Sequence, residues 1–125
     1  MINETLIYIG SGIIILWGIA HIIPTGAIVN GFGQISEDNK KVITMEYIAE
    51  GLALIFLGVL PLILTILVNS PGKAVDIVYL ACAVMLLIMA ILTATTGART
   101  SVIWYKICPA VKTVVAVLFI LGAVL

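Results

Sequence analysis

Two carboxylates stand four residues apart at the head of a long apolar run, in the segment ITMEYIAEGLALIFLG of residues 43–58. Glu46 and Glu50 would share one face of a helix, because residues four apart are neighbours on a helix surface. Ionisable groups inside an apolar segment are costly, and they usually face the interior of a helix bundle or a wet cavity. The two acids are therefore the first candidates for a ligand-binding or proton-relay group.

Other polar side chains stand at comparable depth in the remaining apolar runs. His21 lies less than one turn before the end of the first run, and Lys112 lies within the last. Glu50 lies roughly 10 Å into its own run at 1.5 Å per residue, which is level with Lys112. Four runs thus contribute polar groups to one end of a bundle. The candidates for ligand binding or proton relay are His21, Glu46, Glu50, Thr96, Arg99 and Lys112.

These residue types favour proton transfer or ligand binding over covalent or metal chemistry. A histidine beside a carboxylate can move a proton, and Lys112 or Arg99 could hold an anionic or carbonyl-bearing ligand. One histidine and two glutamates do not make a convincing closed metal site, and no metal is predicted. No nucleophile–base spacing is visible, so catalytic residues are left unassigned.

A purely structural interpretation stands beside the functional one. Glu50 and Lys112 could form a buried ion pair that only fixes helix order. Glu46 could sit among lipid headgroups, where it complements a helix N-terminus, and Arg99 could be an ordinary interfacial charge. The residue pattern leaves both interpretations open.

The composition excludes an ordinary soluble protein. Of 125 residues, 63% are hydrophobic and 10% are charged, and one core in so short a chain cannot hide that much apolar surface from water. Lipid must be the solvent for most side chains, and the length allows one domain, residues 1–125. Six basic and six acidic residues cancel, so the sequence has no excess of positive charge that would indicate nucleic-acid binding. Cys82 and Cys108 lack a CxxC spacing and are interpreted as free thiols.

Four apolar runs are each long enough to cross a hydrocarbon layer, which takes about 20 residues. They cover residues 6–23, 43–68, 74–96 and 102–125. Backbone polar groups cannot stay unpaired in lipid, and the runs lack the alternation of a membrane strand, so they must be helices. The predicted fold is an all-α integral membrane bundle of four antiparallel transmembrane helices.

Charge asymmetry between the links predicts the orientation. Four spans place both chain ends on one side and the first and third links on the other. The side of those two links holds Lys40, Lys41, Arg99 and Lys106, whereas the opposite side holds only Lys73 and the amino terminus. The positive-inside rule therefore predicts a plasma-membrane or inner-membrane protein with both termini outside the cytoplasm and the candidate site towards it.

The segment GIAHIIP, residues 18–24, places Gly18 three residues before His21. It resembles the Gly-x-x-His segment that ends the first span of DoxX-like four-helix membrane proteins. The resemblance covers less than a tenth of the chain. It implies a four-helix bundle of a kind sometimes associated with quinone-linked redox complexes, and it assigns a role to no residue.

The leading functional hypothesis is a small membrane protein that binds, moves or protonates a small or lipid-soluble ligand in a polar intramembrane pocket. One alternative is an enzyme doing acid–base or redox chemistry on a quinone-, sterol- or prenyl-like substrate. Another is a non-catalytic subunit of a membrane complex. The expected partners are the lipid bilayer, a lipid-soluble small molecule, and a second copy or a larger complex. No cofactor is indicated, and the link of residues 24–42 could act as a lid.

Overall fold

The computed structural model describes residues 2–125, and all its regular elements in that range are helical. Four long helices cross the molecule: α1 (Ile2–Ile22), α3 (Glu37–Leu67), α4 (Lys73–Thr95) and α5 (Ile103–Val124). A short helix, α2 (Thr25–Asn30), and a 3-10 turn, η1 (Gly97–Arg99), lie in the links. The prediction of an all-α bundle of four membrane helices is confirmed.

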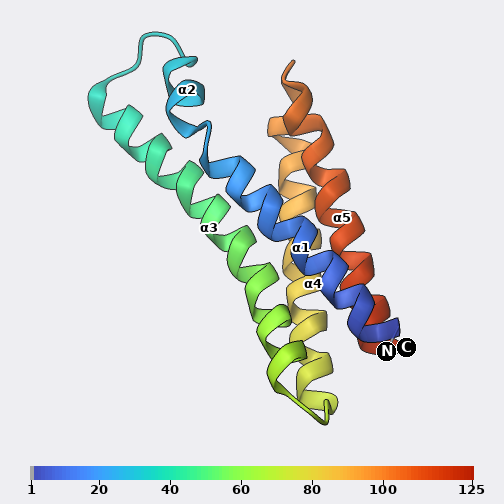
Figure 1. Ribbon diagram of the computed structural model, residues 1–125. Helices are drawn as coiled ribbons and strands as arrows, with labels where there is room; N and C mark the ends of the chain where they lie inside the picture. The colour runs from blue at the N-terminus through green and yellow to red at the C-terminus, as the bar shows by residue number, and fades with distance from the viewer. Residues whose placement is uncertain (1) are drawn as a thin grey trace.

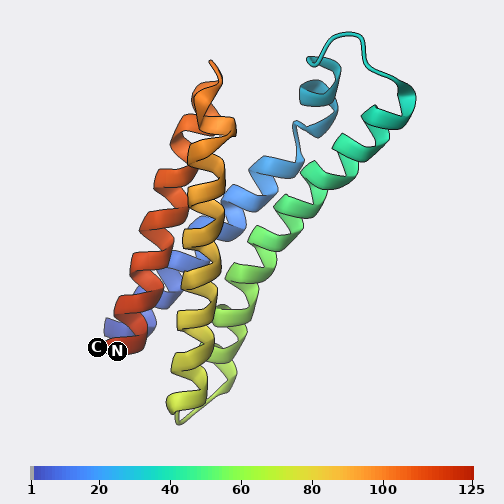
Figure 2. The ribbon, with the colours of Figure 1, turned by 180° about the vertical axis from the view of Figure 1, so that it is seen from behind.

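The four long helices form two pairs, α1 with α3 and α4 with α5, and the pairs contact each other mainly through α1 and α5 (Figure 1). α1 packs along α3 and also against α5, while α4 packs along α5. Both ends of the described chain lie at one end of the molecule, here called the terminal end, and α2 lies at the other, here called the α2 end. Figure 2, seen from behind, shows with Figure 1 that the α1–α3 pair diverges from the α4–α5 pair towards the α2 end.

Local sequence signals set the helix boundaries at the α2 end. α1 stops before Pro24, because a residue that precedes proline is disfavoured in helical geometry. α3 begins at Glu37, six residues before the apolar run starts, because Ser36 caps it by accepting the Asn39 N–H at 3.1 Å. The predicted link of residues 24–42 is therefore largely helical. Gly33 has φ of +78°, a conformation that glycine adopts without the cost a Cβ imposes.

The middle of the bundle is closely packed. The side chains of Ile14, Leu54 and Phe119 are 0% exposed. α1 and α3 approach backbone to backbone at Gly18, where an added Cβ would lie 2.8 Å from the Gly51 carbonyl oxygen. Such close approach is how membrane helices gain packing energy, since lipid supplies no hydrophobic drive between them.

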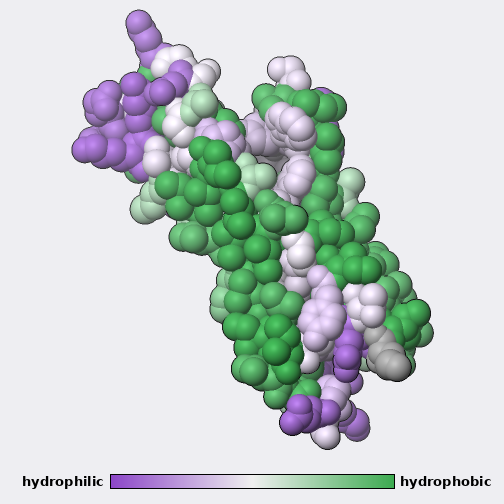
Figure 3. Space-filling view, in the orientation of Figure 1, coloured by the Kyte–Doolittle hydropathy of each residue, from purple (hydrophilic) through white to green (hydrophobic). Residues whose placement is uncertain are grey.

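The surface matches a multi-pass membrane protein. Figure 3 shows hydrophobic residues over most of the molecule's length and hydrophilic residues concentrated towards its two ends. Large apolar side chains such as Leu16, Phe56 and Ile91 are 59–68% exposed. Apolar surface of this extent is stable where it contacts lipid acyl chains.

Candidate functional site

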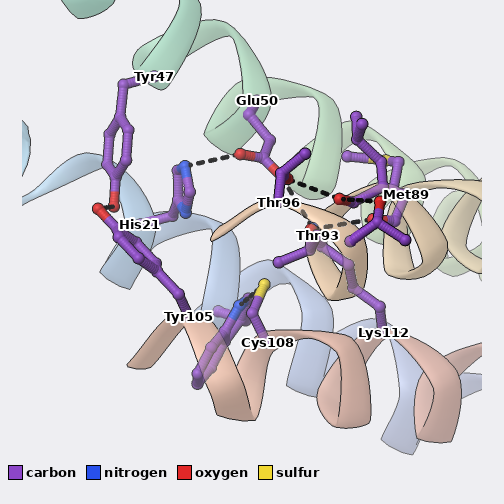
Figure 4. A network of polar contacts seen from close by, with 12 residues as sticks. His21, Tyr47, Glu50, Met89, Thr93, Thr96, Tyr105, Cys108 and Lys112 are labelled. Atoms are coloured by element: carbon purple, nitrogen blue, oxygen red, sulfur yellow. Dashed lines mark hydrogen bonds and ion pairs between the residues drawn. The ribbon is translucent and has the colours of Figure 1, made fainter. Parts of the chain in front are cut away.

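A fully buried lysine lies at the centre of a polar network between α3, α4 and α5 (Figure 4). Lys112 is 0% exposed, and its Nζ donates to Glu50 Oε1 at 2.8 Å and to Thr93 Oγ1 at 2.8 Å. Thr93 in turn donates to the carbonyl oxygen of Met89 at 2.9 Å. A buried ammonium group is tolerated only with a counter-charge and satisfied hydrogens, and the network supplies a counter-charge and two acceptors.

The second oxygen of the same carboxylate faces α1. Glu50 Oε2 lies 3.2 Å from His21 Nε2, and the Glu50 side chain is 35% exposed while that of His21 is 9% exposed. The contact has the distance of an ion pair, yet Nε2 forms no hydrogen bond of acceptable geometry with any residue in the range 2–125. The imidazole and the carboxylate are thus close enough to attract each other as an ion pair without forming an aligned hydrogen bond.

Two tyrosines extend the network from His21 to α5. The His21 imidazole stacks on the Tyr47 ring with centroids 4.1 Å apart and planes 11° apart. Tyr105 donates its hydroxyl hydrogen to the Tyr47 oxygen at 3.3 Å. Tyr47 donates to no acceptor within the described part of the chain, so its own hydroxyl hydrogen remains available.

A cavity of about 360 Å³ lies against this network at the α2 end, and its volume falls within the range of small-molecule sites. Its lining is mostly aromatic and apolar, with residues from α1, α2, α3 and α5 and the links beside them. The aromatic and polar members are Trp17, His21, Tyr47, Trp104, Tyr105 and Cys108. Figure 3 shows the surface hollowed between the α2–α3 region and the end of α4 and α5.

The cavity floor is held by a contact between α1 and α5. The Trp17 indole N–H donates to the sulfur of Cys108 at 3.3 Å, and the Cys108 side chain is buried. The thiol thus gives the indole N–H an acceptor in a wall that is otherwise apolar. This contact joins the α1–α3 pair to the α4–α5 pair where the pairs begin to diverge.

The structure brings three of the six predicted site residues together and leaves three outside. His21, Glu50 and Lys112 form the continuous network described above. Glu46 is exposed, Thr96 is exposed and donates to the Leu92 carbonyl, and Arg99 is exposed on η1. Among residues 2–125, no group of three or more His, Cys, Asp or Glu side chains could hold a metal ion.

Several residues of the site were not among the sequence candidates, although helical spacing could have found them. Tyr47 precedes Glu50 by three residues, Trp17 precedes His21 by four, and Cys108 precedes Lys112 by four. Residues at these spacings share a helix face, so each lies on the same side as a predicted ionisable group. Thr93 carries no such signal, because its partner comes from another helix.

The arrangement provides a chain of polar groups that ends at a cavity wall. Lys112, Glu50 and His21 are linked in that order, and His21 lines the cavity. Such a chain can bind a polar group in the cavity and can exchange a proton between the imidazole and the carboxylate. No protein-family model, curated protein or solved structure matches the chain, so function is argued from this geometry.

Proposed function

We propose that the protein binds a lipid-soluble small molecule in the cavity at the α2 end, with the polar part of that molecule at His21 and Tyr47. One observation carries the proposal. Tyr47, whose hydroxyl hydrogen has no acceptor among the described residues, lines a cavity of about 360 Å³ together with His21. A polar hydrogen on a mostly apolar cavity wall is costly to leave unpaired, and an occupant with an acceptor atom would satisfy it.

The occupant enters from the bilayer. The cavity wall is mostly apolar, and two lining residues, Val102 and Trp104, are 40% and 64% exposed at its edge. An amphiphilic ligand would leave its apolar part there, against lipid. α2 covers the other edge, because Pro24 and Ile28 line the cavity while Val29 is buried. α2 therefore acts as the lid of the site.

The α2 end faces the cytoplasm of a plasma or inner membrane in this proposal. Lys40 and Lys41 near the start of α3, Arg99 on η1 and Lys106 in the first turn of α5 lie at that end, whereas Lys73 at the start of α4 lies at the other. A reporter that is active only outside the cytoplasm, fused after residue 125, should be active. The same reporter inserted after Gly33 should be inactive, and the reverse pattern would overturn the orientation.

The decisive measurement is whether the purified protein carries a bound small molecule. Protein purified in a mild detergent should carry a small molecule that mass spectrometry of its lipid extract detects above the bulk lipid. His21→Phe keeps an aromatic ring against Tyr47 and removes both nitrogens, so it should lose that molecule. Tyr8→Phe, on the exposed face of α1, should retain it. The proposal fails if wild-type protein carries and binds no small molecule, or if His21→Phe retains it fully.

A second function, that of a non-catalytic subunit, is favoured by one observation. Both oxygens of Glu50 already have partners within the chain, Lys112 and His21, so the charges can serve helix order alone. In that case, Glu50→Gln combined with Lys112→Met should keep a native fold and still co-purify with partner chains. A wild-type protein that carries no ligand yet purifies in a complex would select this function.

A further inference from the structure

The chemical class of the ligand follows from the charges around the cavity, and the argument rests on the proposed function. Glu50 is engaged by Lys112 and His21, and Lys112 is engaged by Glu50 and Thr93. No Asp, Glu, Lys or Arg is among the residues that line the cavity. A charged headgroup would therefore enter a poorly hydrated site without a free counter-charge, which costs several kcal/mol per ion.

The cavity wall carries one hydrogen-bond donor, the Tyr47 hydroxyl, that has no acceptor among the described residues. Tyr47 accepts from Tyr105 and keeps its own hydroxyl hydrogen, as no described residue accepts it. His21 also lines the cavity, but its Nε2 faces Glu50 Oε2 at 3.2 Å, which leaves Tyr47 as the donor available to an occupant. A tyrosine hydroxyl without an internal acceptor is best satisfied by a carbonyl or ether oxygen of the occupant.

The shape of the lining favours a flat group. Trp17, Tyr47, Trp104 and Tyr105 contribute aromatic rings, and His21 contributes an imidazole already stacked on one of them. Aromatic faces attract planar unsaturated rings in offset-stacked or edge-to-face arrangements. Aromatic boxes also bind organic cations, but the carboxylate behind His21, that of Glu50, is already paired with the Lys112 ammonium and offers no free counter-charge.

We infer that the headgroup held in this cavity is an uncharged planar ring that carries an oxygen acceptor. The oxygen accepts from Tyr47, and the ring packs among the aromatic side chains. The cavity of about 360 Å³ corresponds to roughly a dozen water volumes at about 30 Å³ each. That space holds one substituted ring, and a longer apolar tail leaves past Val102 and Trp104 into lipid.

Three probes with the same ring and tail test the headgroup. 4-Decylacetophenone carries a carbonyl, decylbenzene carries no acceptor, and 4-decylbenzyltrimethylammonium carries a cation. Native mass spectrometry of protein released from detergent micelles measures occupancy for each. One hydrogen bond should make the ketone bind about threefold to tenfold tighter than decylbenzene. The cation should bind more weakly than both.

Intrinsic fluorescence locates the bound probe, because both tryptophans of the chain, Trp17 and Trp104, line the cavity. The ketone should quench wild-type emission with the same concentration dependence as its occupancy. Tyr47→Phe should reduce the preference for the ketone over decylbenzene to near one. Tyr8→Phe, the matched change outside the cavity, should leave the preference intact.

The outcomes separate the two proposals. Equal binding of the ketone and decylbenzene, or tighter binding of the cation, overturns the headgroup class and leaves ligand binding standing. Absence of binding by all three probes, together with a wild-type protein free of any co-purified molecule, overturns the proposed function itself. The comparison of the three probes on wild-type protein tests the headgroup class even if Tyr47→Phe does not fold.

Discussion

The two ends of the bundle carry cavities of almost equal volume, about 360 Å³ at the α2 end and about 350 Å³ at the terminal end. Their chemistry differs. The terminal cavity includes Asn3, Glu4 and Asp76, and its two acids are exposed or half-buried. At the α2 end the charged groups stand behind the wall, paired, and Lys112 is 0% exposed.

The two cavities differ in how deeply the neighbouring charges are buried and not in volume. A carboxylate near the end of a helix keeps water or headgroups as partners and needs no counter-ion. An ammonium buried between helices has only protein for a partner. The Glu50–Lys112 pair therefore depends on the packing of the helices around it, while the terminal acids can be ordinary surface charges.

Glu50→Gln should have the largest effect on stability. It leaves the Lys112 ammonium, which is 0% exposed, without a counter-charge. Breaking a buried pair costs about 3–5 kcal/mol, and the low end, about 3 kcal/mol, is expected because the Glu50 carboxylate is 35% exposed. Unfolding by denaturing detergent in mixed micelles measures the change.

Glu46→Gln is the matched control, since it makes the same change four residues away on an exposed position of α3. Its effect should stay within about 0.5 kcal/mol. Lys112→Met in the Glu50→Gln background should recover much of the lost stability, because the unpaired charge is gone. Equal stability of the Glu46 and Glu50 variants would show that depth of charge does not separate them.

The sequence predicted the fold well because the relevant signal is strong. Runs of about 20 apolar residues with few charges allow only membrane helices. The starts of α1 and α3 lie before the apolar runs of residues 6–23 and 43–68, because hydropathy marks where lipid begins and not where a helix begins. The start of α3 depends on the cap at Ser36, which lies in a polar stretch.

Gly18→Ala should have the second largest effect and should act on the same end. The new Cβ would lie 2.8 Å from the Gly51 carbonyl oxygen and 3.1 Å from the Ile55 nitrogen, and backbone atoms cannot move aside as a side chain can. α1 would shift from α3, which costs about 1–3 kcal/mol and lengthens the His21–Glu50 contact.

Gly12→Ala tests the same substitution on the same helix with no neighbour within 4 Å of the new Cβ. It should leave stability unchanged or raise it by up to about 1 kcal/mol, because alanine is the better helix former. Ligand retention should fall in the Gly18 variant and persist in the Gly12 variant. The packing argument is wrong if both variants behave alike.

The candidate site was only partly readable from the sequence. Depth along each span placed Glu50 level with Lys112, and the structure pairs them. Depth also grouped Thr96 and Arg99 with them, although both side chains are exposed. A single sequence gives position along a helix but not which way each helix faces its neighbours. The partnership of Lys112 with Thr93 depends on that rotation.

Tyr79→Phe should cost about 1 kcal/mol and should affect stability alone. The Tyr79 hydroxyl is 2.6 Å from Thr65 Oγ1, in a hydrogen bond that joins α3 to α4 beside the terminal cavity. Tyr47→Phe removes a longer contact of 3.3 Å, so its effect on the free energy of unfolding should be smaller. Tyr47→Phe should instead weaken ligand binding. If Tyr79→Phe weakened ligand binding and Tyr47→Phe did not, the ligand site would lie at the terminal end.

Asp76→Asn should have the smallest effect, a loss of about 0.5 kcal/mol. Asp76 lies in the first turn of α4, whose cap residue Gly72 offers no side-chain hydrogen bond, so its charge complements the unsatisfied N–H groups there. Lys73→Gln should raise stability by a similar amount, because a cation at a helix N-terminus is unfavourable.

Both effects should shrink as salt is added to the micelle solution, since half-buried and exposed charges are screened. The Glu50→Gln loss should not shrink in that way, because salt does not reach a fully buried ammonium. Equal salt sensitivity at the two ends would mean that the Lys112 network is hydrated and that depth of charge does not separate the cavities.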